Sequence, residues 1–153
     1  MASALKNLST YDEAQLPSAE EFAFGIVVAD WNPEITHALY EGCYDTLIKH
    51  GAKEANIHTA QVPGSFELPA GAKMMIDKHK GETSHNEYIN QAVASGLTNL
   101  SMVYGKPFIF GVLTPNTEEQ ARDRAGGKHG NKGVEAAVTA IRMAALKEDL
   151  KAA

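Results

Sequence analysis

Residues 122–133 concentrate glycine and positive charge in the sequence Arg-Asp-Arg-Ala-Gly-Gly-Lys-His-Gly-Asn-Lys-Gly. Four of these residues are glycine and four are arginine or lysine, although the whole chain has a formal net charge of -5. Glycine lets backbone N–H groups approach a ligand closely, and arginine and lysine neutralise an anion. The run therefore predicts a bound phosphate, and its alternative interpretation is a mobile surface turn.

Two further side chains could act on a heterocyclic substrate. Trp31 is the only tryptophan of the chain, and its indole offers a flat face on which a ring could stack. His85 follows small polar residues and could transfer a proton near neutral pH. The ordinary alternatives are a partly buried anchor for Trp31 and an unpaired surface histidine for His85. Phe110, taken alone, is predicted to be a core residue.

Apolar runs and helical patterns alternate along the chain and indicate an α/β domain. Residues 22–29 and 108–113 are apolar enough for strands buried on both faces of a parallel sheet, and residues 56–62 read as another strand. Helices are predicted over residues 33–49, 66–77, 87–104 and 134–147. This alternation predicts a three-layer α/β/α sandwich with a central, mostly parallel sheet.

Local signals mark where the predicted helices begin. Asn32 is expected to cap the first helix, with Pro33 at its first helical position. Ser65 is expected to cap the next helix. Thr117 and Gln120 have the spacing of a capping box, which predicts another helix directly after Thr117.

Polar segments follow each predicted strand, at residues 30–32, 63–67 and 114–116. In open parallel sheets, ligands bind outside the carboxyl ends of the strands. Residues 81–85 precede a predicted helix, and the N-terminus of a helix favours anions. We therefore expect these segments to meet at one edge of the sheet and to form the ligand site there.

Length and composition predict an N-terminal arm, residues 1–21, and a single domain, residues 22–153. The polar arm is expected to become ordered only when it docks on something. The net negative charge argues against a general nucleic-acid binder, and the single cysteine, Cys43, excludes an intrachain disulfide. No apolar run reaches membrane-spanning length and the N-terminus lacks an apolar signal core, so we expect a cytoplasmic protein.

Five segments occur with the residues, and in the order, of one enzyme family. They are Gly-Ile-Val-Val-Ala-Asp-Trp-Asn at 25–32, Val-Pro-Gly-Ser-Phe-Glu at 62–67, Lys-Gly-Glu-Thr-Ser-His-Asn-Glu-Tyr at 80–88, Ile-Phe-Gly-Val-Leu-Thr at 109–114 and Arg-Ala-Gly-Gly-Lys-His-Gly-Asn-Lys-Gly at 124–133. From about residue 22 to residue 146 the chain resembles the 6,7-dimethyl-8-ribityllumazine synthases, the penultimate enzymes of riboflavin biosynthesis. Each motif alone is weak, but five in the same order are specific.

The resemblance implies a flavodoxin-like fold and a transferase reaction. In that reaction 5-amino-6-(D-ribitylamino)uracil condenses with 3,4-dihydroxy-2-butanone 4-phosphate. An amine attacks the ketone, phosphate leaves, and ring closure yields the lumazine. The family needs no cofactor and no metal, and much of the rate would come from positioning the two substrates.

The resemblance also implies roles for individual residues. Trp31 matches the aromatic residue that stacks on the pyrimidine, and Phe110 matches an aromatic residue that an adjacent subunit supplies. The residues matched to the uracil and its ribityl chain are Ser65, Phe66 and Glu67. The residues matched to the phosphorylated ketone are Gly81, Glu82, Thr83, Arg124 and Lys132. His85 matches the residue that transfers a proton.

The family members form a homopentamer with shared active sites, and many bacterial members pack twelve pentamers into a hollow icosahedral 60-subunit shell. The resemblance thus implies small-molecule substrates and a homo-oligomer, with neither nucleic acid nor membrane as a partner. The arm before Phe22 is expected to join a neighbour's sheet. Two alternatives are a non-catalytic shell-forming or flavin-binding subunit of the same fold, with riboflavin stacked on Trp31, and a flavodoxin-like binder of a phosphate ligand.

One departure from the family pattern concerns residues 74–80, which run straight into the loop at 81–85. The family has a strand there, so one central strand is expected to be missing between Asp77 and Gly81, roughly a dozen residues with its connections. Three explanations are open. The printed sequence omits residues that the protein contains, the residues are deleted from the protein, or another segment takes the place of the strand. The intact flanking motifs favour the first explanation, because such a deletion should be severely destabilising.

Overall fold

The computed structural model describes residues 9–78 and 93–153, and the structural statements that follow concern these residues. The α-helices are α1 Pro33–Lys49, α2 Leu68–Lys78, α3 Val93–Tyr104, α4 Glu118–Arg124 and α5 Lys132–Ala152. The strands are β1 Phe24–Ala29, β2 Ile57–Val62, β3 Ala125–Gly127 and β4 Gly130–Asn131. Three short 3-10 helices are η1 Glu13–Gln15, η2 Glu54–Asn56 and η3 Ser65–Glu67.

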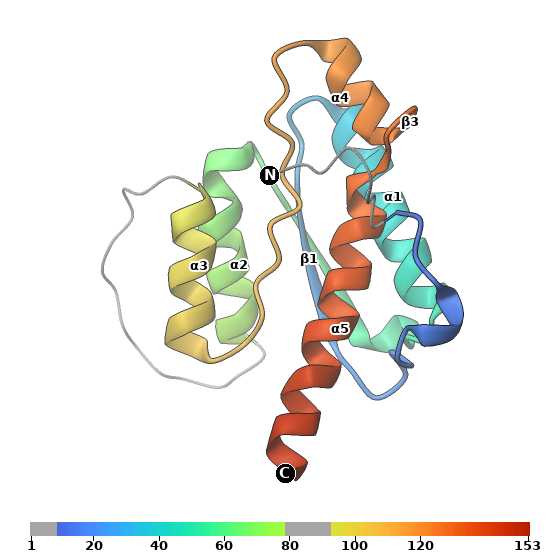
Figure 1. The fold of residues 1–153 in the computed structure, drawn as a ribbon. Helices are drawn as coiled ribbons and strands as arrows, with labels where there is room; N and C mark the ends of the chain where they lie inside the picture. The colour runs from blue at the N-terminus through green and yellow to red at the C-terminus, as the bar shows by residue number, and fades with distance from the viewer. Residues whose placement is uncertain (1–8, 79–92) are drawn as a thin grey trace.

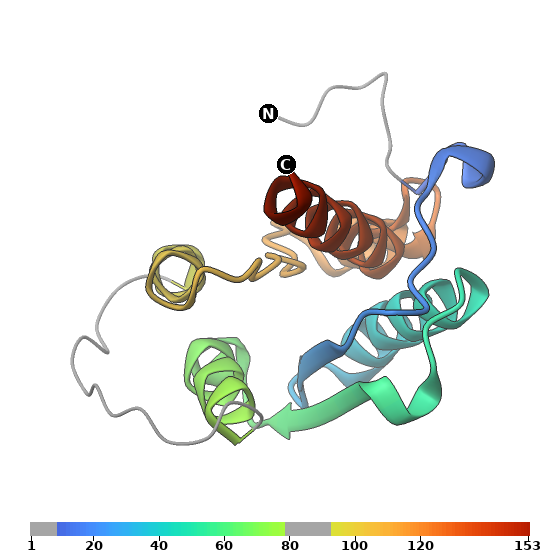
Figure 2. The ribbon, with the colours of Figure 1, turned by 90° about the horizontal axis from the view of Figure 1, so that it is seen from below.

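Helices cover both sides of a parallel strand pair. β1 and β2 run parallel, with Phe24 opposite Ile57 and Ala29 opposite Val62. Helices α1 and α5 lie together on one side of β1, and α2 and α3 lie on the other (Figures 1 and 2). The predicted α/β/α arrangement with a parallel sheet is therefore confirmed.

The main hydrophobic core lies where α1 and α5 pack against each other. Leu47, Val138 and Ile141 are its largest fully buried side chains. The two helices approach so closely that a Cβ on Gly133 would overlap the carbonyl oxygen of Leu39. The last glycine of the glycine-rich run is therefore required by helix packing, independently of any ligand.

Residues 9–21 of the predicted arm pack on the same chain. Leu16 and Ala19 are buried in the main core, and the Ala19 N–H donates to the carbonyl of His50 across 2.9 Å. The Tyr11 hydroxyl lies 2.6 Å from Nε2 of His50, and Lys49 pairs with Glu13. This part of the arm thus docks against α1 of its own chain.

The predicted strand at residues 108–113 is wrong. These residues belong to no strand and pass from α3 to α4 between the two pairs of helices (Figures 1 and 2). Their apolar side chains still have a packing role, since Val112 contacts the cluster of Ala29, Val62 and Leu68. A strand needs a hydrogen-bonded neighbour, and in the described part of the chain β1 pairs only with β2. The apolar pattern thus indicated that most of these residues are half-buried, but it could not show that a strand to pair with is missing beside them.

The family's central strand was expected directly after Asp77. The chain after Lys78, including Gly81, lies outside the described residues. The carboxylate of Asp77 accepts from the Lys73 ammonium and from the Tyr104 hydroxyl, each across 2.6 Å. These contacts tie the end of α2 to the end of α3. The two helices therefore pack together directly, next to the place where sheet and helices were expected to alternate.

Of the three capping residues predicted from the sequence, one caps its helix as expected and two do not. Thr117 caps α4 as predicted, because its Oγ1 accepts from the Gln120 N–H across 3.2 Å. Asn32 precedes α1 but is left-handed, with φ 57° and ψ 60°, and its side chain makes no capping hydrogen bond. Ser65 begins the short helix η3, and α2 begins only at Leu68.

Candidate active site

The loops that follow β1 and β2 are joined by backbone hydrogen bonds. The Asp30 N–H donates to the carbonyl of Val62 across 2.8 Å, and the Trp31 N–H donates to the carbonyl of Pro63 across 3.2 Å. The ladder of β1 and β2 thus continues for two residues past the strands. This confirms that residues 30–32 and 63–67 meet at one edge of the sheet.

Two aromatic side chains are displayed at this edge. Trp31 is 74% exposed and Phe66 is 60% exposed. The interpretation of Trp31 as a partly buried anchor is therefore wrong. Ser65 is exposed as well, and Glu67 is half-buried with its carboxylate turned back toward Gly64. The edge combines apolar ring faces with a hydroxyl and a carboxylate, which suits a polar heterocycle.

The third polar segment lies beside the start of α1. A cavity of about 560 Å³ is lined by Asn32 to Ile35 and, from the other side, by residues 115–118 with Ala121 and Arg122. The guanidinium of Arg122 pairs with Glu118 at 2.7 Å and Glu34 at 2.8 Å. The hydrogen bond to Glu118 and the charge of Glu34 raise the pKa of Arg122. Arg122 thus fastens α4 to α1, and its charge is already matched by two carboxylates.

The glycine-rich run folds into a tight antiparallel hairpin of β3 and β4. Gly126 and Gly130 have φ angles of 120° and 79°, which residues other than glycine rarely adopt. The His129 N–H donates to the carbonyl of Asp123 across 2.8 Å and closes the hairpin onto the end of α4. The backbone conformation of the hairpin by itself requires glycine at these positions. A phosphate site in this run therefore remains a prediction.

Arg124 is the last residue of α4 and is half-buried. Its Nη1 donates to the carbonyl of Gln120 across 3.0 Å, one turn earlier in the same helix. This bond holds the guanidinium at the helix end that leads into the hairpin. A guanidinium carries five N–H donors, so the bond to Gln120 is compatible with further contacts to an anion.

Lys132 and Phe110 line one groove of about 820 Å³ between α5 and residues 105–110. Phe110 is 42% exposed there, so its interpretation as a core residue is wrong. Apolar residues of α5 form the opposite wall, among them Met143, Leu146 and Leu150. The groove therefore presents a lysine ammonium and an aromatic ring on one surface.

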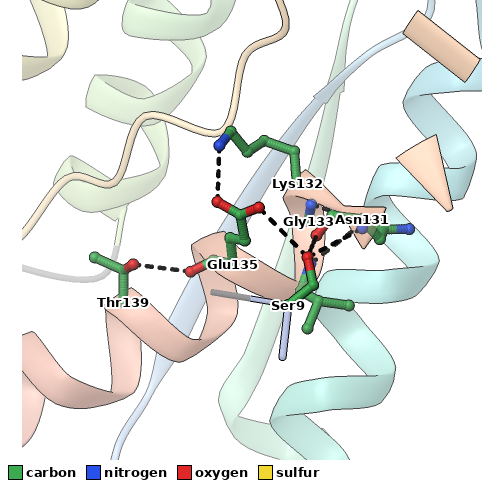
Figure 3. A network of polar contacts seen from close by, with 7 residues as sticks. Ser9, Asn131, Lys132, Gly133, Glu135 and Thr139 are labelled. Carbon is green, nitrogen blue, oxygen red and sulfur yellow. Dashed lines mark hydrogen bonds and ion pairs between the residues drawn. The ribbon is translucent and has the colours of Figure 1, made fainter. Parts of the chain in front are cut away.

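The Lys132 ammonium is held by Glu135, whose Oε2 lies 2.7 Å away (Figure 3). The Glu135 side chain is only 17% exposed, and the Lys132 side chain is 42% exposed. The second carboxylate oxygen of Glu135 accepts from the Ser9 hydroxyl across 3.4 Å. The sequence analysis predicted neither Glu135 as the partner of Lys132 nor the contact of Ser9 with Glu135. The three-residue spacing of Lys132 and Glu135 could have indicated the first, but nothing in the sequence links Ser9 to α5.

The structure sorts the predicted site residues into separate places. Trp31, Ser65, Phe66 and Glu67 lie at the edge formed by the loops after β1 and β2. Phe110 and Lys132 line the groove along α5, whose lining includes none of those four residues. Arg124 lies at the end of α4. The remaining predicted residues, Gly81, Glu82, Thr83 and His85, lie outside the described residues.

Metal ligation and thiol chemistry have little support in this part of the molecule. Among residues 9–78 and 93–153, no group of three or more His, Cys, Asp or Glu side chains could hold a metal ion. Burial raises the pKa of the Cys43 thiol to about 12. Cys43 is therefore a packing residue at neutral pH, since the thiolate is the reactive form.

Comparison with known proteins decides the family. The family model described as 6,7-dimethyl-8-ribityllumazine synthase matches residues 21–148. The chain belongs to this family of transferases, which act in riboflavin biosynthesis. It is 50% identical to the 6,7-dimethyl-8-ribityllumazine synthase of Cytophaga hutchinsonii, over 95% of this chain and 98% of that protein. It is 49% identical to the synthase of Parabacteroides distasonis, over 94% of this chain and 97% of that protein.

The same alignments reveal a deficit of residues in this chain. The alignment with the Cytophaga relative spans 157 positions, whereas 95% of 153 residues is about 145 residues, so at least about 12 positions have no counterpart here. For the Parabacteroides relative, 155 positions face about 144 residues, which is 94% of 153. The deficit matches the length of the strand that the family motifs lead one to expect after Asp77.

None of the described helices is both long enough and apolar enough to span a membrane.

Proposed function

We propose that this chain catalyses the condensation of 5-amino-6-(D-ribitylamino)uracil with 3,4-dihydroxy-2-butanone 4-phosphate to 6,7-dimethyl-8-ribityllumazine. The observation that carries the proposal is the match of residues 21–148 to the synthase family, with 50% identity to a relative over 95% of this chain. The exposed rings at the carboxyl ends of β1 and β2 support it, because they lie where parallel sheets bind ligands.

The pyrimidine substrate binds at the edge that carries Trp31 and Phe66. The indole face of Trp31 stacks on the uracil ring. Ser65 and Glu67 hydrogen-bond the uracil and the hydroxyl groups of the ribityl chain, since a hydroxyl and a carboxylate provide both a donor and acceptors. The backbone bonds from Asp30 and Trp31 to the second loop fix the relative position of these groups before substrate arrives.

The phosphorylated ketone binds to the residues of the second set. Arg124 and Lys132 neutralise its phosphate, and Gly81, Glu82 and Thr83 hold the ketone beside the amine. The 5-amino group attacks the ketone carbon, the ketone oxygen leaves as water, and elimination releases the phosphate. The ribitylamino nitrogen then attacks the remaining carbonyl carbon, and loss of a second water closes the lumazine ring. His85 shuttles protons between these groups. Holding both substrates in reacting geometry supplies most of the acceleration, and acid–base catalysis contributes less.

A second copy of the chain completes the site. Phe110 and Lys132 line a groove separate from the edge that carries Trp31, which fits a site whose two sets of residues come from different subunits. The proposed assembly is a homopentamer, with the 60-subunit shell as its larger form. The proposed organisation is an arm, residues 1–21, and one catalytic domain, residues 22–153, in the cytoplasm.

Product formation tests the proposed function. The purified chain is incubated with both substrates, and the fluorescence of the lumazine product is followed over time. Product is expected only when both substrates are present. Riboflavin binding without product would contradict the proposal and favour a non-catalytic, flavin-binding subunit of the same fold.

A further inference from the structure

We propose that Ser9 is a positioning residue that acts through Glu135 on Lys132. Under this proposal, docking of the N-terminal segment fixes the ammonium that binds the substrate's phosphate. The inference rests on the proposed function for the role of Lys132, and it adds a residue and a segment that the family motifs do not include.

The first observation is that both carboxylate oxygens of Glu135 are engaged. Oε2 pairs with Lys132 at 2.7 Å, and Oε1 lies 3.4 Å from the Ser9 hydroxyl, whose single proton is shared with the carbonyl oxygen of Asn131 at 3.3 Å (Figure 3). Because the Glu135 side chain is mostly buried, water competes less with these bonds than at an exposed ion pair. Contacts at both oxygens restrict the rotation of the carboxylate and, with it, the positions open to the lysine that it holds.

The second observation is that Ser9 also contacts the start of α5. Its Oγ accepts from the Asn131 N–H across 3.1 Å. Asn131 in turn caps α5, because its Oδ1 accepts from the backbone N–H of Gly133 across 2.7 Å. Ser9 therefore contacts Asn131, the residue before Lys132, and is linked to the Lys132 ammonium indirectly, through Glu135.

The third observation is that other contacts dock the segment. Leu16 and Ala19 are buried in the core, and Tyr11 contacts His50. Removal of the Ser9 hydroxyl is therefore expected to leave residues 11–21 in place. The positional effect on Lys132 can then be measured without unfolding the segment.

The test compares Ser9→Ala with Ser18→Ala. Ser18 is the matched control, because it is an exposed serine of the same segment whose hydroxyl accepts from the nearby Glu20 N–H. Ser9→Ala is expected to raise the KM for the phosphorylated ketone about three- to tenfold, with kcat changed less than about twofold. Ser9→Thr keeps the hydroxyl and is expected to restore most of the KM, and Ser18→Ala is expected to match the unmutated chain.

A double-mutant cycle with Lys132→Ala decides whether the effect passes through the lysine. In the Lys132→Ala background, Ser9→Ala is expected to change the KM no further. The same factor in both backgrounds, or equal KM values for Ser9→Ala and Ser18→Ala, would overturn the proposal. A Lys132→Ala variant with unchanged KM would instead contradict the phosphate role of Lys132.

Calorimetric titration with inorganic phosphate gives a second measurement that needs no turnover. Under the proposal, Ser9→Ala weakens phosphate binding about three- to tenfold, and this effect disappears in the Lys132→Ala background. This pattern would support the coupling even if the chain formed no lumazine. Equal phosphate affinity in Ser9→Ala and Ser18→Ala would overturn it in either case.

Discussion

Trp31 and Pro63, which follow different strands, are joined by a backbone hydrogen bond of 3.2 Å. The bond fixes the main chain of Trp31 while its side chain remains 74% exposed. A fixed backbone below an exposed ring favours stacking, because little backbone entropy is lost when a ligand binds. A substitution of the Trp31 side chain should therefore change the binding of the pyrimidine without changing the stability of the fold.

Trp31→Ala is expected to weaken pyrimidine binding while leaving stability nearly unchanged. Loss of a ring stacked on a heterocycle costs about 1–3 kcal/mol, so the KM for the pyrimidine should rise between about fivefold and about 150-fold. Trp31→Phe keeps a ring and should recover part of the affinity. Steady-state kinetics with each substrate varied in turn measure the effect. A rise confined to the KM for the ketone would contradict the stacking role.

Arg124→Ala and Arg122→Ala form a matched pair within one helix. Arg124→Ala is expected to raise the KM for the phosphorylated ketone at least about tenfold, because charged hydrogen bonds to phosphate are lost. Arg122 is neutralised by Glu34 and Glu118, so Arg122→Ala should lower the thermal midpoint slightly and leave this KM unchanged. Kinetics and thermal melts of both variants make the comparison. Equal effects on KM would show that the two arginines do not have distinct roles.

The sequence allowed prediction of features that depend on neighbours in the chain. Pro33 and Gly51 bracket α1, and Thr117 caps α4, because these signals act within a few residues. Asn32 was predicted as a cap, but the turn that brings Trp31 to Pro63 places it in the left-handed region instead. The bonds of Ser9 to α5 join residues 122 and 126 positions apart. No local pattern encodes contacts of that kind.

Gly133→Ala is expected to destabilise the fold strongly. A methyl group there would collide with the backbone of α1, and the helices would have to separate at a cost of about 3 kcal/mol or more. Gly105→Ala is the control, because no atom lies within 4 Å of its added Cβ and only its φ of 56° is unfavourable. That strain costs about 1 kcal/mol. Urea denaturation measures both, and a smaller loss at residue 133 than at residue 105 would contradict the packing argument.

The contact of His50 with the N-terminal segment is expected to make the protein less stable as the pH is lowered below neutral. Desolvation lowers the pKa of His50 below its ordinary value of 6.5, while the charge of Glu13 opposes the shift and that of Lys49 adds to it. The unfolded chain therefore binds the proton first as pH falls. The stability due to neutral His50 is complete above pH 6.5 and is lost as the pH falls toward the pKa of the folded state.

His50→Gln is the comparison for this pH dependence, because an amide oxygen can still accept from Tyr11 but does not titrate. Urea denaturation between about pH 7.5 and pH 5 should show a steeper loss of stability in the unmutated chain than in the variant. Other titrating groups act in both proteins and cancel in the difference. Parallel curves for the two proteins would rule out a contribution from His50.

Restoring the absent residues is expected to convert residues 108–113 into a strand. The stretch of the Cytophaga hutchinsonii relative that corresponds to the family's strand after Asp77 would be inserted between Asp77 and Gly81. A strand at that place could pair with β1 on one edge and with residues 108–113 on the other, because parallel strands hydrogen-bond on both sides. The backbone N–H groups of Val112 and its neighbours should then exchange with solvent more slowly than in the present chain.

Hydrogen exchange followed by NMR measures this change residue by residue, and an inserted glycine- and serine-rich linker of the same length is the control. The linker cannot pair as an apolar strand does, so it should leave exchange at residues 108–113 unchanged. The insertion should also raise the thermal midpoint, because a central strand buries apolar surface of both helix layers. If exchange at residues 108–113 were equally fast with either insert, the absence of a strand neighbour would not be the reason that these residues form no strand.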